Sequence, residues 1–438
     1  MRLSADVLNE ATQAHIGGRS SEAEALYDHL IAADPEGWYP YYALGTLYGQ
    51  EFMAGRAPSL GRAMVMLHAA LALKPDSPEA LSNLASCYGH AGRRERALEL
   101  FTLALETPGG NKAETWSNLA GIFVNNGTPE LAIKYAERAL AINPELAEAR
   151  NHKALGLLEL SQFADAWPVN EGRQGLAQWT PRVWNAEVPQ WRGERCRRLA
   201  IWREQGLGDE IMFLTCLEQI RDRAEEISIE CAPRLVEAIQ YSFPWAKVYG
   251  VHTDRPWEPD YHCPMGSLPL AGAWPVKPNT YLKTPAKYPK GARYRIGISW
   301  FGGTSRTQEA LRNTLPCEWR TLLGQDAEVI SVQYGERDDE AAVVGVDHDQ
   351  ASIDDVSRLL AMIQSCDLVV SVINTTVHMA GAMGVPCLAL VPAKPSWPFG
   401  LKGEHMVWYE SVRLIRQAPD ETWASVLERA RERCADYR

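Results

Sequence analysis

The first chemical candidate is a short glycine-rich segment that carries an acid. Residues 204–210 (EQGLGDE) follow the apolar run Leu199–Trp202 and precede a helical pattern. Gly206 and Gly208 permit a tight turn, and an aspartate at the start of a helix commonly caps it. The same carboxylate at the mouth of a cleft could act as a general base. Spacing alone leaves both roles open for Asp209.

A second candidate is the segment 374–378 (NTTVH), which also joins an apolar run to a helical pattern. Backbone N–H groups and hydroxyls at the start of a helix favour a phosphate or diphosphate. His378 falls on the first turn of the expected helix. A histidine in a helix is usually just packed, but this one lies at an expected anion site, so ligand contact is the competing interpretation.

A third and weaker candidate is Gly302-Gly303-Thr304, after the apolar run Arg295–Trp300. Glycines allow a ligand to approach the backbone closely. Arg306 or Arg312 could neutralise the charge of a phosphate.

The elements that must position these segments alternate between strands and helices. In the first block we expect strands at 199–202, 226–231 and 247–251 and a helix over 234–241. After a hinge at Lys277–Arg293, we expect strands at 295–300, 328–333, 368–372 and 387–391 and helices over 353–365 and from 377. Such alternation predicts parallel sheets covered by helices, here two Rossmann-like halves facing a cleft. Ligands bind at the carboxyl ends of the strands in such sheets.

Taken together, these blocks resemble the heptosyltransferase-like (family 9-like) glycosyltransferases, which have the GT-B fold. The similarity covers about residues 199–416, and five blocks occur in the family's order. The blocks are WREQGLGDEIMF, DYHCPMGSLPL, RIGISWFGG, DLVVSVINTTVHMAGAMGVP and VWYESVRLIRQ. The resemblance implies an amino-terminal half at 196–285 and a nucleotide-sugar-binding half at 292–438.

The resemblance also implies a role for individual residues. Asp209 would take the proton from an acceptor hydroxyl. Trp397 and Gly400 would shape the sugar site. The implied donor-binding residues are Gly206, Gly208, Gly302, Gly303, Arg312, Gln333, Tyr334, Asn374, Thr375, Thr376 and His378.

One departure from the family concerns the acid five residues before the histidine, which often contacts the sugar. Here that position is Ile373, which argues against a heptose donor and keeps a non-catalytic interpretation open. The resemblance implies a metal-independent reaction with no cofactor, since the nucleotide sugar is a substrate. We find no D-x-D at a strand end; Asp338-Asp339 and Asp354-Asp355 are expected on the surface and at a helix start.

The first third of the chain repeats with a period of about 34 residues. Ala63, Ala97, Ala132 and Ala166 form a column, and aromatic and leucine residues recur around each. This pattern resembles the tetratricopeptide repeat, a pair of helices that stacks into a solenoid. We expect the solenoid over residues 4–170, with six extra residues around 51–58 that lengthen one inter-helix turn.

A solenoid offers a concave groove, usually to a peptide or protein. Asn83, Asn118 and Asn151 recur at nearly the repeat period and are candidates for a ladder that contacts a protein acceptor. An incidental or capping role is the alternative. We expect residues 171–195 to cap the solenoid and connect it to the next domain, with Trp167, Trp179, Trp184 and Trp191 packing at the join.

Composition excludes several functional classes. The 438 residues carry a formal net charge of −11, so a nucleic-acid partner has no bulk electrostatic support. The nine cysteines are scattered without a C-x-x-C pair, which argues against a zinc ribbon or disulfide framework. The amino terminus lacks the apolar core of a signal peptide, and no run of about 18 apolar residues occurs. We therefore expect a cytoplasmic protein without a membrane span. The fusion of such repeats to a module of this kind resembles a bacterial architecture.

Three hypotheses for the function follow. The first is a glycosyltransferase that acts on a hydroxyl, with the acceptor on a protein, flagellin being one candidate. The second is a non-catalytic repeat scaffold with a degenerate transferase-like half. The third is an adaptor that binds carbohydrate without turnover.

Overall fold

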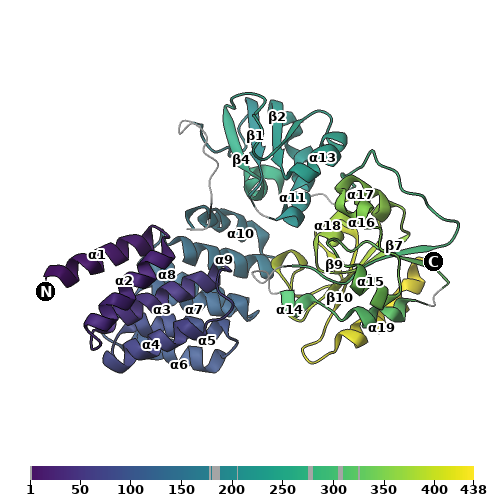
Figure 1. Cartoon of the computed structure of the whole chain (residues 1–438). Coiled ribbons are helices and arrows are strands. Elements are labelled where there is room, and N and C mark those ends of the chain that lie inside the picture. The colour runs from purple at the N-terminus through teal and green to yellow at the C-terminus, as the bar shows by residue number, and fades with distance from the viewer. Residues whose placement is uncertain are drawn as a thin grey trace. The chain divides into compact units, whose positions relative to one another are not determined.

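The chain forms two compact units, one of residues Met1–Leu157 and Val169–Leu176 and the other of Leu158–Pro168 and Ala177–Arg438. The computed structural model describes residues 2–176, 179, 188–204, 206–274, 280–303, 309–323 and 326–438. The first unit is a helical solenoid, and the second contains two largely parallel sheets with helices, an α/β module (Figure 1). This is the predicted fold class.

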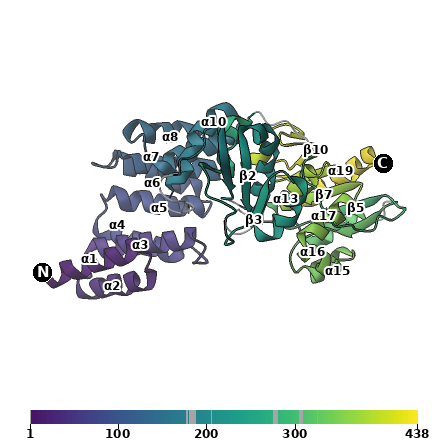
Figure 2. The same ribbon diagram turned by 90° about the horizontal axis from the view of Figure 1, so that it is seen from above.

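The first unit consists of antiparallel helix pairs that stack in succession (Figure 2). The repeats lie where the pattern of alanine, glycine and proline residues in the sequence predicts them. The helices of this unit are α1 (Arg2–Ile16), α2 (Ser20–Ala33), α3 (Trp38–Met53), α4 (Gly61–Leu73), α5 (Pro78–His90), α6 (Arg94–Glu106), α7 (Ala113–Asn125), α8 (Pro129–Ile142) and most of α9 (Ala147–Glu159), with the 3₁₀ turn η1 (Glu171–Gly175). Most of α10 (Phe163–Asn170) belongs to the second unit.

The alanine column is fully buried: Ala63, Ala97, Ala132 and Ala166 are all 0% exposed. In the pairs α3–α4, α5–α6 and α7–α8, a small residue at this position lets the two helices pack closely. The expected longer turn lies between α3 and α4, where residues 54–60 replace the three residues 91–93 that join α5 to α6. The insertion also makes α3 longer than α5.

The first sheet of the second unit has four parallel strands in the order β3-β2-β1-β4. The strands are β1 (Cys196–Trp202), β2 (Ala224–Cys231), β3 (Lys247–Gly250) and β4 (Tyr261–Pro264). The connecting elements are α11 (Leu207–Phe213), η2 (Leu214–Cys216), α12 (Leu217–Ile220), η3 (Arg221–Arg223), η4 (Pro233–Leu235), α13 (Val236–Ser242), η5 (Met265–Ser267) and the π-helical turn η6 (Pro269–Ala273). Three of these strands match the sequence expectation, and β4 was not expected as a strand.

The second sheet has six strands in the order β6-β5-β7-β8-β10-β9, all parallel except the β9–β10 pair. The strands are β5 (Arg295–Ser299), β6 (Glu328–Ser331), β7 (Leu368–Val372), β8 (Cys387–Val391), β9 (His405–Met406) and β10 (Tyr409–Arg416). The helices are α14 (Glu309–Arg312), η8 (Pro316–Leu322), α15 (Asp338–Val344), α16 (Gln350–Asp354), α17 (Val356–Gln364), α18 (Thr375–Ala382), η9 (Trp397–Phe399), α19 (Trp423–Arg433) and η10 (Cys434–Tyr437).

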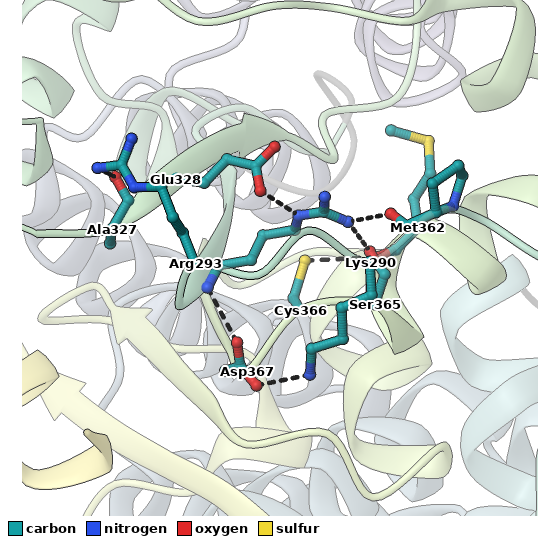
Figure 3. Close-up of polar contacts among 10 residues, drawn as sticks. Lys290, Arg293, Ala327, Glu328, Met362, Ser365, Cys366 and Asp367 are labelled. Atoms are coloured by element: carbon teal, nitrogen blue, oxygen red, sulfur yellow. Dashed lines mark hydrogen bonds and ion pairs between the residues drawn. The ribbon is translucent and has the colours of Figure 1, made fainter.

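A network of polar contacts holds the amino ends of β5 and β6, and Figure 3 labels Lys290, Glu328, Ser365 and Asp367 among its members. The Arg295 side chain is 5% exposed, and its Nε donates to Glu328 Oε2 at 2.9 Å. One terminal nitrogen donates to Ser365 Oγ at 2.7 Å, and the backbone N–H donates to Asp367 Oδ2 at 2.9 Å. Lys290 pairs with the other oxygen of Asp367 at 2.7 Å. The end of the expected hinge is therefore attached to the second sheet, at the edge opposite the strand carboxyl ends.

Two glycines one turn apart on α3 test the packing of the repeats. A Cβ on Gly45 would lie 2.7 Å from Leu67 Cγ and 3.1 Å from the Leu67 backbone nitrogen, whereas a Cβ on Gly49 would meet nothing within 4 Å. We expect Gly45→Ala to lower the free energy of unfolding by about 2 kcal/mol through overpacking. Gly49→Ala should raise it by up to about 1 kcal/mol, because alanine favours helix. Urea unfolding of both variants measures this; equal effects would contradict the packing described.

Candidate functional site

The predicted acid, Asp209, lies in the first turn of α11, directly after the carboxyl end of β1. Its Oδ2 accepts a hydrogen bond of 3.2 Å from the Gly206 backbone N–H, so the side chain caps its own helix. Burial raises the pKa of the Asp209 carboxyl from its usual 3.8 to about 6, and the nearby charges of Glu204 and Glu210 act in the same direction. A capping role and a pKa suited to a general base therefore coexist in one carboxylate.

The two neighbouring glutamates hold the loops at the carboxyl ends of the first sheet together. Glu204 Oε1 accepts from the backbone N–H of Gly266, after β4, at 2.5 Å. Glu210 is 1% exposed; it pairs with Arg203 at 2.5 Å and accepts from the Ala232 N–H, after β2, at 2.8 Å. The loops after β1, β2 and β4 therefore form one connected surface around Asp209.

In the second sheet, Asn374 joins the loops after β5 and β7. Its amide donates to Ser299 Oγ at 2.8 Å and to the Phe301 carbonyl at 2.9 Å, while its Oδ1 accepts from the Thr376 N–H at 2.9 Å. Gly302 lies so close that a Cβ there would be 2.4 Å from Asn374 Cβ. Asn374 therefore acts as the cap of α18 and as the support of the glycine loop.

Two of the expected donor contacts are buried and face the protein. Gln333 is 0% exposed, and its Oε1 accepts from Ser299 Oγ and from the N–H groups of Trp300 and Phe301 at 2.8–3.0 Å. Thr376 is also 0% exposed. The geometry makes Gln333 a support of the loop after β5 rather than a contact for a base or ribose, because its acceptor oxygen is fully used inside the protein.

The remaining expected residues of this half lie nearer the surface. Gly303 has a φ of +98°, which favours glycine. Thr375 is half-buried at the start of α18. Arg312, at the end of α14, donates to the Ile373 carbonyl at 3.2 Å. Gln205, Thr304, Arg306 and Trp184 lie outside the described residues.

His378 brings the two halves of the second unit together. It is 6% exposed, and a Cβ on Gly208 would lie 3.1 Å from its Cδ2, so α11 and α18 approach each other closely at this glycine. Burial lowers the pKa of His378 to about 4, which makes the imidazole neutral at pH 7. Residues 206–209 and 374–378, predicted separately from the sequence, are therefore neighbours in space.

Sequence reasoning missed two arginines in this region. The charges of Arg312, Arg337 and Arg234 all oppose the burial that raises the pKa of Tyr334, and Arg234 also acts on Glu210. Arg234 comes from η4, after the carboxyl end of β2, and is exposed. Three arginines from separate segments of the chain therefore act electrostatically on Tyr334. The position of Arg234 directly after a strand end was the only signal in the sequence.

Trp397 belongs to an aromatic cluster that adjoins this region. Its ring lies 6.0 Å from that of Trp167, 6.5 Å from Phe213 and 6.0 Å from Trp408. Phe213 is on α11, one turn after Asp209. Gly400 has a φ of +56°, and its carbonyl accepts from Arg416 at 2.8 Å.

A separate cavity of about 800 Å³ lies against β8, β10 and α19. Its arginines already have partners: Arg413 contacts His405 at 2.7 Å, Arg429 pairs with Glu421 at 2.7 Å and Arg433 with Asp436 at 3.6 Å. None of the predicted site residues lines it.

The asparagines of the solenoid face neighbouring repeats. Asn83 donates to Thr46 Oγ1 at 2.8 Å, and Asn118 donates to Ser82 Oγ at 3.2 Å. The third such contact between repeats is made by His152, whose Nδ1 lies 3.4 Å from Ser117 Oγ. These side chains join successive repeats, and whether an acceptor also contacts them stays a prediction. Asn151 is the residue before His152, and its place in an acceptor groove also stays a prediction.

Two searches of the described residues were negative. Among them, no group of three or more His, Cys, Asp and Glu side chains could hold a metal ion. Within the same ranges, every helix is too short or too polar to cross a bilayer.

Comparison with known proteins identifies the repeats. Residues 59–117 and 113–146 match family models of the tetratricopeptide repeat. Protein FlbA of Caulobacter vibrioides is 26% identical over 449 residues, which cover 83% of this chain and 74% of FlbA. Protein O-mannosyl-transferase TMTC1 of Mus musculus is 28% identical over 132 residues, 29% of this chain and 13% of TMTC1. The crystal structure of PilW, a type IV pilus biogenesis factor, covers 40% of this chain and 78% of its own at 21% identity and a TM-score of 0.35.

The raised pKa of Asp209 has a consequence for stability. Because the folded-state pKa of about 6 lies above the usual 3.8, the buried carboxylate destabilises the protein at neutral pH, and this cost disappears as the pH falls through 6 toward 4. Asp209→Asn should therefore raise the free energy of unfolding at pH 8 by about 2 kcal/mol, with the gain shrinking below pH 6. Denaturant unfolding at pH 8 and pH 5 checks this. A gain independent of pH, or one shared by Asn at exposed Asp222, would contradict it.

Proposed function

We propose that the chain is a glycosyltransferase that moves a sugar from a nucleotide-sugar donor to a hydroxyl on a protein. The observation that carries the proposal is the meeting of two strand-end loops, one with Asp209 and one with His378, at the edge where parallel sheets bind ligands. The tetratricopeptide repeats supply a surface of the kind that holds proteins. The resemblance of residues 199–416 to heptosyltransferase-like enzymes supports the same assignment.

In the proposed reaction, Asp209 removes the proton of the acceptor hydroxyl as its oxygen attacks the anomeric carbon of the donor. The bond between that carbon and the donor's phosphate oxygen breaks, and the nucleotide leaves with the electron pair. A carboxyl pKa of about 6 leaves Asp209 largely ionised at pH 7 and still basic enough to accept this proton. Arg234, Arg312 and Arg337, whose charges act on Tyr334, would balance the phosphate charge. Arg337 is shared with Glu340, with which it pairs at 2.6 Å.

The proposal extends to the fold type, the metal dependence, the compartment and the acceptor. We propose a GT-B arrangement, a reaction without a metal ion and a cytoplasmic bacterial enzyme, with flagellin among the candidate acceptors. TMTC1 carries the name of a protein O-mannosyltransferase, which supports a protein acceptor. That match spans 13% of TMTC1, so the proposal rests more on the geometry of the site than on this relative.

One observation favours a non-catalytic scaffold as the second candidate. Ile373 occupies the place of the family's acid, and its side chain is 1% exposed, so it offers the sugar no polar contact. In that case the repeats would recruit partners and the α/β module would bind no donor.

Thermal unfolding with UDP-, GDP-, ADP-, TDP- and CMP-sugars tests the proposal. A ligand at about 100 times its dissociation constant adds about 2.7 kcal/mol of stability, so one nucleotide class should raise the midpoint of the second unit. Asp209→Ala should keep this rise and lose transfer, because the base acts on the acceptor rather than on the donor.

The matched control is Asp222→Ala, an exposed acid on η3 that should keep both properties. A folded wild-type protein that responds to none of the five classes would favour the scaffold. A normal turnover in Asp209→Ala would leave Asp209 as a helix cap only.

A further inference from the structure

Three buried side chains form a line of hydrogen-bonding groups next to the Asp209 loop. Tyr281 Oη lies 2.6 Å from the Ile211 carbonyl oxygen on α11. Tyr409 Oη lies 3.5 Å from Tyr281 Oη and 3.2 Å from His378 Nδ1. Tyr281 is 5% exposed and Tyr409 1%. Water therefore has little access to this line, and its protons must be shared among its own members.

The positions of the protons follow from what each group can donate. A carbonyl oxygen only accepts, so the Tyr281 hydroxyl gives its hydrogen to Ile211 and can itself only accept. Tyr409 has one hydrogen to donate. If His378 Nδ1 carried the ring hydrogen and donated it to Tyr409, the Tyr409 hydrogen would have only Tyr281 Oη as acceptor, at 3.5 Å and beyond the usual O–H···O range. With a bare Nδ1, the same hydrogen has an acceptor at 3.2 Å. A neutral imidazole has one N–H, so a hydrogen accepted at Nδ1 requires that Nε2 carry the ring hydrogen.

The Nε2 edge of His378 faces the catalytic loop. Of the His378 ring atoms, Cδ2 and Nε2 lie nearest to the Gly208 position, 3.1 and 3.6 Å from where its Cβ would be. Among the described residues, no protein group forms a hydrogen bond with Nε2. The hydrogen on Nε2 is therefore left for a group that comes from outside the protein.

The Tyr409 ring is held so that it cannot turn away from His378. It packs on α18 at Gly381, where a Cβ would lie 2.4 Å from the ring. Gly381 is three residues after His378, on the same face of the helix. Tyr281 in turn is tied to α18 by its backbone N–H, which donates to the Ala382 carbonyl at 3.0 Å.

We propose that Tyr409 is a positioning residue: its hydroxyl donates to Nδ1 and fixes His378 in the form whose Nε2–H points beside the Gly208–Asp209 turn, where it binds a phosphate oxygen of the donor. The choice of phosphate rests on the proposed function, whereas the form of the imidazole does not. Asp209 and His378 then have opposite roles, one accepting a proton from the acceptor and the other donating a hydrogen bond to the leaving group. If Nδ1 carried the hydrogen instead, Nε2 would repel a phosphate oxygen.

Nitrogen-15 NMR of the full-length protein with labelled histidine shows directly which imidazole nitrogen of His378 carries the hydrogen. His378→Gln assigns the resonances among the ten histidines. We expect a protonated Nε2 and a bare Nδ1 in the wild type, the same form in Tyr281→Phe, and a mixture of both forms in Tyr409→Phe. The phenylalanine variants keep the ring packing, so a loss of fold does not confuse the result. A protonated Nδ1 in the wild type, or an unchanged spectrum in Tyr409→Phe, overturns the proposal.

Binding of the free nucleotides UDP, GDP, ADP, TDP and CMP supplies the second measurement. The nucleotide that binds the wild type should bind Tyr409→Phe roughly tenfold more weakly and Tyr281→Phe almost equally well. Equal affinity in all three proteins would overturn the phosphate contact. If no nucleotide binds the wild type while the NMR result holds, the proposed function fails and the role of Tyr409 in fixing His378 stands.

Discussion

The α/β module depends on the side-chain amide of Asn374. It hydrogen-bonds to the end of β5, to the loop that contains Gly302 and to the first turn of α18. This one buried amide therefore sets the distance between two strand-end loops and the direction in which α18 leaves the sheet. The position of His378 on that helix, and its approach to Gly208, follow from the same bonds. A buried amide with all its partners inside the protein is costly to disturb, so the site is held rigid from below.

Much of the fold is visible in the sequence because it rests on periodicity. The alanine column predicts the helix pairs, since a small residue is needed wherever two helices touch. The strands around Ile298, Val370 and Leu390 were predicted because strands buried on both faces are continuous apolar runs. β4 and β10 were not identified as strands: β4 ends in a proline, and β10 alternates exposed and buried side chains. Short or mixed segments form strands only because a neighbouring strand offers a partner.

Part of the site was also predicted from the sequence. Asp209 and His378 were found because both follow a strand end and open a helix, a rule that needs no knowledge of side-chain direction. The predictions that differ from the structure are those that depended on where a side chain points. Gln333 lies at a strand end and turns inward, and the third contact between repeats is made by His152, which was not predicted. The charge of Arg234, which follows a strand of the other sheet, acts on Tyr334, and no local pattern could indicate this.

The central claim is that the loops carrying Asp209, Gly302, Tyr334 and His378 form one donor site. Hydrogen–deuterium exchange of the full chain, with and without saturating UDP-, GDP-, ADP-, TDP- and CMP-sugars, tests it most directly. The account predicts that one nucleotide class slows exchange in peptides covering residues 206–210, 302–303, 334–335 and 375–378 together, and leaves α19 unchanged. Slowing confined to β10 and α19, which line the separate cavity, or no slowing with any donor, would contradict it.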